Sequence, residues 1–313
     1  MTAKIPKSGL SWNEIQVILN SAQRSSTNWK KGRLAGMVYY TREDILKIAM
    51  DAYAMFFSEN MVIPEAFPGL ADLENLVIDM AIQLLGGSPA SRGIMTSSGT
   101  ESIFIAVKTA RESTRKNKTI KGTPEIVTVR SAHPTFNKAA HFLNLKVKRL
   151  PLGQDYRADV QAMKNAITNN TIMLVGSALG YPHGRIDPIT ELGELAQSQN
   201  LWLHVDACVE GFLAPFVKKL GKPLPAFDLS VPGVCSISSD LHKHGYTGKG
   251  ASVVLFKNEN HYKYSAFDFN DWPRGRYLTR TFTGTRSGGP VACAWAGLNY
   301  LGEEGYLQLA VTS

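Results

Sequence analysis

Several groups of polar residues, each next to an apolar run, are the candidates for chemistry in this chain. The first is the small turn Ser98-Gly99-Thr100, which leads into a helical pattern over 102–111. Free amide groups at a helix start, together with the positive end of the helix dipole, bind anions, so the turn suits a phosphate. A simple helix cap is the alternative. Glu101 is an unexpected neighbour for an anion, and we expect it to face away.

Asp206 ends the apolar run that begins at Trp202. A carboxylate buried at a strand end needs a partner, and a protonated ring nitrogen would be one. Such a carboxylate keeps a pyridinium protonated, and the ring then accepts electrons. The alternative is an aspartate that caps the following helix. A metal pair with His204 is disfavoured because no further ligands follow at a suitable spacing, so we predict no metal site.

Lys243 lies in a loop rich in glycine and histidine, over residues 240–250. Neighbouring cations and partial desolvation would lower the pKa of this amine and make it a nucleophile. A basic loop for phosphate or nucleic acid is the alternative. His133 follows another apolar run and precedes Pro134. Its imidazole could stack on an aromatic ring, although a lone histidine is more often structural.

Strand-like and helical patterns alternate from about residue 76 onward. The expected strands are 126–129, 147–150, 172–175, 201–205, 234–237 and 253–256. This alternation predicts an α/β domain with a mostly parallel sheet, in which ligands bind at the carboxyl ends of the strands. Residues 1–75 are expected to form an N-terminal helical segment, with helix starts at 11–14 and 41–44. The large domain is expected over 76–300, and 301–313 would begin a link to a further domain.

The bulk composition sets outer limits on function. The chain has 313 residues and a net charge of +8, but its basic runs lack the interleaved aromatic residues of a nucleic-acid platform. Three widely spaced cysteines argue against a disulfide framework and fit a reducing compartment. No signal-peptide core and no apolar run of about 20 residues is present. We therefore expect a cytoplasmic protein without an integral membrane segment or a nucleic-acid partner.

The sequence resembles the fold-type I pyridoxal-5′-phosphate (PLP) enzymes, within the group of amino-acid decarboxylases and sphingosine-1-phosphate lyases. The resemblance runs from about Pro64 to Tyr306. The stretches that carry it are Phe67–Leu70, Ser98–Ser102, Tyr181–Ile189, His204–Cys208, Phe227–Val234, Ser236–Tyr246, Lys249-Gly250, Gly284–Arg286 and Glu304–Tyr306.

The resemblance implies an aspartate aminotransferase-like large domain, with a mixed sheet flanked by helices, and the following site. Lys243 would carry PLP as a Schiff base, Asp206 would pair with the pyridine nitrogen and His133 would stack on the ring. The residues implied around the cofactor phosphate are Ser98, Gly99, Thr100 and His242, with Gly284 and Thr285 reaching the cofactor of a neighbouring subunit. Tyr246 and Lys249 match positions at the substrate end.

The implied reaction is a retro-aldol cleavage of a phosphorylated long-chain base to an aldehyde and a phosphorylated amine, with Lys243 or Lys249 as the base. The implied assembly is a homodimer with shared active sites. An amino-acid decarboxylase of the glutamate or aromatic type is the alternative activity. A truncated PLP-fold protein that no longer turns over is the alternative that is not an enzyme.

Four positions depart from the family pattern. Ile63 stands where the lyases have a histidine that helps form the substrate site. Ser98 and Glu210 replace glycines that are common in the family, and Thr285 replaces a serine. The family also has a small C-terminal domain, and the residues after Tyr306 are too few to form one. We therefore expect a fragment or a truncated product.

Overall fold

The computed structural model describes residues 4–34 and 36–312, and it divides at Tyr40 into two compact units. The first unit contains helix α1 (Trp12–Arg24) and the short helix η1 (Trp29–Lys31). The Ser11 side chain accepts a hydrogen bond from the Glu14 amide, and the Glu14 side chain accepts one from the Ser11 amide. This capping box confirms the helix start predicted at Ser11.

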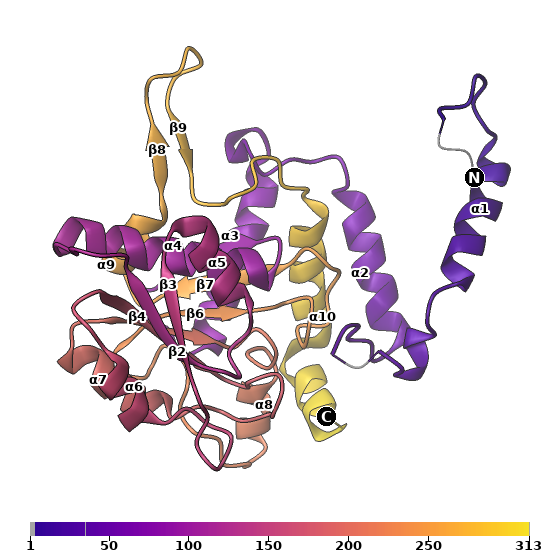
Figure 1. The fold of residues 1–313 in the computed structure, drawn as a ribbon. Coiled ribbons are helices and arrows are strands. Elements are labelled where there is room, and N and C mark those ends of the chain that lie inside the picture. The colour runs from indigo at the N-terminus through magenta and orange to yellow at the C-terminus, as the bar shows by residue number, and fades with distance from the viewer. Residues whose placement is uncertain (1–3, 35, 313) are drawn as a thin grey trace. The chain divides into compact units, whose positions relative to one another are not determined.

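The second unit, from Thr41 onward, contains a seven-stranded mixed sheet with the strand order β1-β7-β6-β5-β4-β2-β3 (Figure 1). Strand β7 is antiparallel to both of its neighbours, and the pairs from β6 through β5, β4 and β2 to β3 are parallel. The strands are β1 (Arg92–Thr96), β2 (Glu125–Val129), β3 (Lys146–Leu150), β4 (Thr171–Ser177), β5 (Trp202–Asp206), β6 (Val234–Ser239) and β7 (Ser252–Phe256). The predicted mostly parallel sheet is confirmed.

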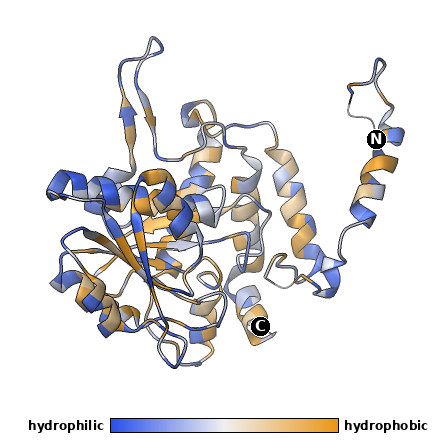
Figure 2. Cartoon of the chain, viewed as in Figure 1, coloured by the Kyte–Doolittle hydropathy of each residue, from blue (hydrophilic) through white to orange (hydrophobic). Residues whose placement is uncertain are grey.

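Alternate residues of each strand enter two separate apolar cores, as the period of two in a strand requires. In β5, Leu203 and Val205 belong to one core, whereas Trp202 belongs to the other. Helices α4 (Gly99–Asn117) and α5 (Thr135–Leu143) cover the Trp202 side. Residues of α6 (Val160–Ala166), α7 (Ile189–Ser198) and α8 (Ala214–Lys219) pack into the other core. In Figure 2 the hydrophobic colour concentrates in the strands between these helices.

Helix α10 (Gly289–Thr312) packs against both α2 (Glu43–Met55) and α3 (Pro68–Leu84) (Figure 1). Helix α10 contains a kink at Gly302, whose φ of 56° lies in the left-handed region that glycine tolerates. Helix α2 begins near the predicted position, but Thr41 does not cap it, because the N-cap residue is Arg42. The short helices of this unit are η2 (Pro64–Ala66), α9 (Glu259–Tyr262) and η3 (Lys263–Ser265).

Two features of the fold were not predicted. Strand β1 contains Arg92 and Gly93 and is short, so its sequence has little strand character, and it forms by antiparallel pairing with β7. Strands β8 (Phe267–Phe269) and β9 (Tyr277–Thr279) form a hairpin that projects from the rest of this unit (Figure 1). The domain limits predicted at 75 and 300 stay predictions. Among the described residues, no helix is both long and apolar enough to cross a membrane.

Candidate functional site

The carboxyl ends of β5 and β6 place Asp206 and the loop of Lys243 at one edge of the sheet. Asp206 is the last residue of β5 and pairs in register with Ser238 of β6. Because side chains alternate along a strand, Asp206 faces the same side as Trp202 and His204, which is the side of α4 and α5. Asp206 is 8% exposed, and its Oδ1 atom accepts a hydrogen bond from the Cys208 amide at 3.1 Å.

Lys243 forms an ion pair that the sequence did not predict. Its Nζ atom lies 3.1 Å from Oδ2 of Asp240, and the Asp240 side chain is 3% exposed. Burial by itself would lower the pKa of Lys243, but the negative charge of Asp240, with that of Asp206, outweighs burial and raises the pKa above its usual value. The expectation of a lowered pKa is therefore wrong, because neighbouring carboxylates favour the charged form of the amine.

Lys249 and His242 lie in the same loop as Lys243. The Nζ atom of Lys249 donates a hydrogen bond to the His242 carbonyl at 3.3 Å. Partial burial and the positive charge of Lys243 lower the pKa of Lys249. Burial also lowers the pKa of His242, whose Nδ1 atom lies 2.6 Å from the Ala251 carbonyl. Of the two lysines, Lys249 thus releases its proton more readily.

The turn before α4 lies against Asp240. A Cβ atom at Gly99 would come within 2.7 Å of the Asp240 carboxylate, so this position requires glycine. The Ser98 hydroxyl caps α4 by accepting a hydrogen bond from the Glu101 amide at 3.2 Å. The amides of Gly99 and Thr100 belong to the first helical turn, where no acceptor exists within the helix. They are therefore suited to bind an anion.

His133 is joined to this turn through two threonines. Its Nδ1 atom lies 2.8 Å from Oγ1 of Thr135, and that oxygen lies 3.5 Å from Oγ1 of Thr100. The His133 side chain is exposed, whereas Thr135 is buried at the start of α5. A chain of contacts thus runs from Lys243 through Asp240 to the α4 turn, and from there to His133.

Gly284 and Thr285 are exposed, in a loop that Glu101 holds. The Oε1 atom of Glu101 accepts hydrogen bonds from the amides of Phe282, at 2.9 Å, and Thr283, at 3.4 Å. Glu101 therefore faces these amides, and no local pattern indicates this partner because the two segments are 181 residues apart.

Tyr246 is buried and has a φ of 56°, which is uncommon for a residue with a side chain. Its hydroxyl lies 3.1 Å from Nδ1 of His244, and Nε2 of His244 lies 3.2 Å from Oε1 of Glu210. The tyrosine ring is tilted against that of Tyr306, at 6.4 Å between centroids. Glu210, which departs from the family pattern, thus takes part in a hydrogen-bonded group next to the Lys243 loop.

A buried chain of hydroxyl groups also supports Asp240. Its Oδ1 atom accepts a hydrogen bond from Ser252 at 2.6 Å, and the Ser252 hydroxyl lies 2.8 Å from that of Ser102. The Ser102 hydroxyl in turn lies 2.6 Å from that of Thr96. These links join β7, α4 and β1 beneath the turn. Serine and threonine give no functional signal in a sequence, because the same residues are common throughout folded proteins.

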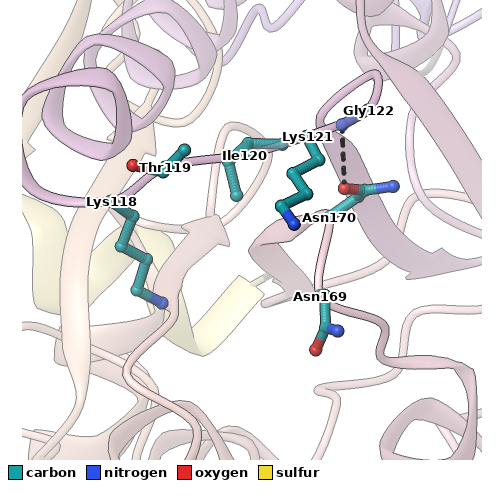
Figure 3. Close-up of a pocket in the computed structure, with 7 residues that line it drawn as sticks. All are labelled: Lys118, Thr119, Ile120, Lys121, Gly122, Asn169 and Asn170. Atoms are coloured by element: carbon teal, nitrogen blue, oxygen red, sulfur yellow. Dashed lines mark hydrogen bonds between the residues drawn. The ribbon is translucent and has the colours of Figure 1, made fainter.

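An open hollow lies at the opposite edge of the sheet, near the amino ends of β2 and β4 (Figure 3). The residues that line it are Lys118, Thr119, Ile120, Lys121, Gly122, Asn169 and Asn170. It contains none of the predicted site residues, and the Gly122 amide donates to the Asn170 side chain across it at 3.3 Å (Figure 3).

The fold and this site define a class of protein. The family described as the pyridoxal-dependent decarboxylase conserved domain matches residues 4–274, and the chain belongs to it. Membership of this family implies pyridoxal phosphate as the cofactor.

Comparison with individual relatives and solved structures shows similarity to sphingosine-1-phosphate lyases. The chain is 43% identical to a sphingosine-1-phosphate lyase of Oryza sativa over 98% of its length, which is 58% of that protein. It is also 43% identical to sphingosine-1-phosphate lyase 1 of Rattus norvegicus, over 97% of this chain and 53% of the relative. The solved sphingosine-1-phosphate lyase of Burkholderia pseudomallei matches with a TM-score of 0.95 at 36% identity, over 99% of this chain and 73% of that one. The chain thus spans little more than half the length of these curated relatives.

The arrangement of residues fits pyridoxal phosphate. The α4 turn offers amide donors for a phosphate, and Gly99 lets the turn lie directly against the Asp240 carboxylate. Asp206 supplies a buried carboxylate, which suits a protonated ring nitrogen. Lys243 supplies the only side-chain amine that is ion-paired to Asp240 among the described residues.

Proposed function

We propose that this chain carries the cofactor site of a PLP-dependent carbon–carbon lyase. The reaction would cleave a phosphorylated long-chain base, of the sphingosine-1-phosphate kind, into an aldehyde and a phosphorylated amine. The observation that supports this most strongly is 35–43% identity to sphingosine-1-phosphate lyases over 92–98% of this chain, in relatives that include those of Saccharomyces cerevisiae and Oryza sativa. Lys243 and Lys249, which the reaction needs, lie in one loop beside Asp206.

In this proposal, the bound cofactor supplies a ring that stabilises negative charge on the carbon next to the substrate nitrogen. Asp206 would hold the ring-nitrogen proton, and His133 would cover one face of the ring. Lys243 would hold the cofactor through its side-chain amine. The Lys243 amine must first lose the proton that its ion pair with Asp240 stabilises.

The phosphate group of the cofactor is assigned to the amides and hydroxyls of the α4 turn, which are those of Ser98, Gly99 and Thr100, with His242 nearby. Lys249 is the better base for the proton of the substrate β-hydroxyl, because its pKa is lowered whereas that of Lys243 is raised. Tyr246 is assigned to the substrate end, where its position is fixed by His244.

The proposal includes a cytoplasmic homodimer with shared active sites. Gly284 and Thr285 support this, because both are exposed and lie beside Phe282, whose side chain is 55% exposed. Large exposed aromatic residues beside polar groups are typical of subunit contacts. Sedimentation of the purified protein at several concentrations tests the dimer, and a monomer at every concentration contradicts it.

Absorbance of the purified protein tests the cofactor assignment. We expect a band near ~420 nm after addition of pyridoxal phosphate, from the cofactor bound to Lys243. Lys243→Ala should abolish the band. Lys249→Ala should keep it and lose turnover, whereas the exposed control Lys164→Ala should change neither. A wild-type protein that stays colourless in excess cofactor contradicts the assignment.

A substrate panel then separates the two activities of this family. Phosphorylated long-chain bases and amino acids are incubated with the coloured protein, and aldehyde and CO₂ are measured in parallel. Aldehyde from the phosphorylated base is the expected result. CO₂ from an amino acid without any aldehyde would assign the chain to the decarboxylases, among which a probable L-tyrosine/L-aspartate decarboxylase of Methanothermobacter thermautotrophicus is 34% identical.

A further inference from the structure

Glu101 connects two segments of the site that are far apart in the sequence. Its Oε2 atom accepts hydrogen bonds from the amide of Ser97, at 2.8 Å, and from the Ser97 hydroxyl, at 2.7 Å. Its Oε1 atom accepts from the amides of Phe282 and Thr283 at 2.9 and 3.4 Å. Glu101 therefore holds the start of the α4 turn on one side and the 282–285 loop on the other.

Only a carboxylate satisfies this arrangement. Each oxygen of Glu101 receives two donors, and all four donors are N–H or O–H groups. The residue is 7% exposed, so a donor without an acceptor here would not be solvated by bulk water. A glutamine would turn its amide group toward Ser97 or toward the 282–283 amides in either orientation, and would oppose donor to donor.

The same contacts explain how a negative charge sits next to an anion-binding turn. The charge of Glu101 is directed to Ser97 and the 282–283 amides, which are donors to it, whereas the first-turn amides of Gly99 and Thr100 are not among its partners. The carboxylate thus fixes the position of the turn without occupying its phosphate-binding groups.

We propose that Glu101 is a positioning residue that sets the affinity of the α4 turn for the cofactor phosphate. It does so by fixing Ser97, and with it Ser98-Gly99-Thr100, against the 282–285 loop. This inference rests on the proposed function, because it assigns the phosphate of pyridoxal phosphate to the α4 turn.

The test compares pyridoxal phosphate with pyridoxal, which lacks the phosphate. Binding of each to the full chain is followed by the absorbance near ~420 nm. Glu101→Gln should weaken the binding of pyridoxal phosphate on the order of tenfold or more, which is the loss expected from opposed buried donors. The same variant should keep the dissociation constant of pyridoxal within about twofold of the wild-type value, because that ligand has no phosphate.

Two controls accompany this variant. Glu112→Gln changes a glutamate of the same helix that pairs with Arg111 and Arg115, and should leave both affinities unchanged. Ser97→Ala removes one of the four hydrogen bonds and should weaken pyridoxal phosphate binding in the same direction but less. If circular dichroism shows that Glu101→Gln does not fold, the test uses Ser97→Ala instead. The deciding quantity is then the ratio of its affinities for pyridoxal phosphate and pyridoxal, compared with the wild-type ratio.

Equal weakening of both ligands, or a lowered melting temperature with unchanged ligand affinities, would overturn the inference, because Glu101 would then serve stability alone. Tryptic cleavage after Arg280 gives a separate readout, since release of the 282–285 loop should accelerate it in Glu101→Gln. A wild-type chain that binds neither ligand contradicts the proposed function itself. A wild-type chain that binds pyridoxal phosphate while Glu101→Gln binds it equally well contradicts only this inference.

Discussion

Asp240→Asn should speed the reaction of Lys243 with the cofactor aldehyde near neutral pH. The Lys243 Nζ and Asp240 Oδ2 atoms are 3.1 Å apart, and the Asp240 side chain is 3% exposed. At this distance, an effective dielectric constant of about 20 gives a Coulomb attraction of about 5 kcal/mol. Burial of the amine opposes that attraction, so we expect removal of the charge to leave burial dominant and to lower the pKa of Lys243.

A lower pKa increases the fraction of neutral, reactive amine. Well below the pKa, a decrease in the pKa raises this fraction steeply, so the rate at pH 7 should rise on the order of tenfold or more. The substitution keeps the size of the side chain, and therefore the close contact with Gly99.

The assay is stopped-flow absorbance near ~420 nm after mixing with pyridoxal phosphate, repeated from pH 6 to pH 10. The pH–rate profile should rise with an inflection that moves to lower pH in the variant. Asp79→Asn, at an exposed position of α3, is the matched control and should keep the wild-type profile. An unchanged profile in Asp240→Asn would refute the assignment of Asp240 as the charge that holds the Lys243 proton.

Two further predictions concern stability. Burial lowers the pKa of His204 to about 3 in the folded chain, whereas the ordinary pKa of histidine in the unfolded chain is about 6.5. Between these two pH values, His204 binds a proton in the unfolded chain but not in the folded chain. Stability should therefore fall as the pH decreases, by about 2 kcal/mol between pH 7.5 and pH 5.0 from this residue, and His204→Gln should remove that part of the fall in urea denaturation. Phe136 is fully buried beside His204, at 5.9 Å between ring centroids. Phe136→Ala should lower the free energy of unfolding by about 3–5 kcal/mol in the same assay. A loss below about 1 kcal/mol would contradict the packing described for the α5 side of the sheet.

The strands with a strong apolar pattern were determined by the sequence alone. Those at 126–129, 172–175 and 253–256 coincide with β2, β4 and β7, because a buried strand needs a run of β-branched and apolar residues wherever it lies. The strand-end position of Asp206 followed in the same way. These features depend on neighbours within a few residues, which a sequence shows directly.

The contacts of the site were decided by the tertiary structure. Asp240 was visible beside Lys243, but its ion pair, which reverses the expected change in the pKa of that lysine, depends on how the 240–251 loop turns. Glu101 meets amides 181 residues further along the chain. Strand β1 forms only because β7 offers an edge to pair with. Sequence patterns report local periodicity and burial, whereas these features arise from groups that only the folded chain brings within hydrogen-bonding distance.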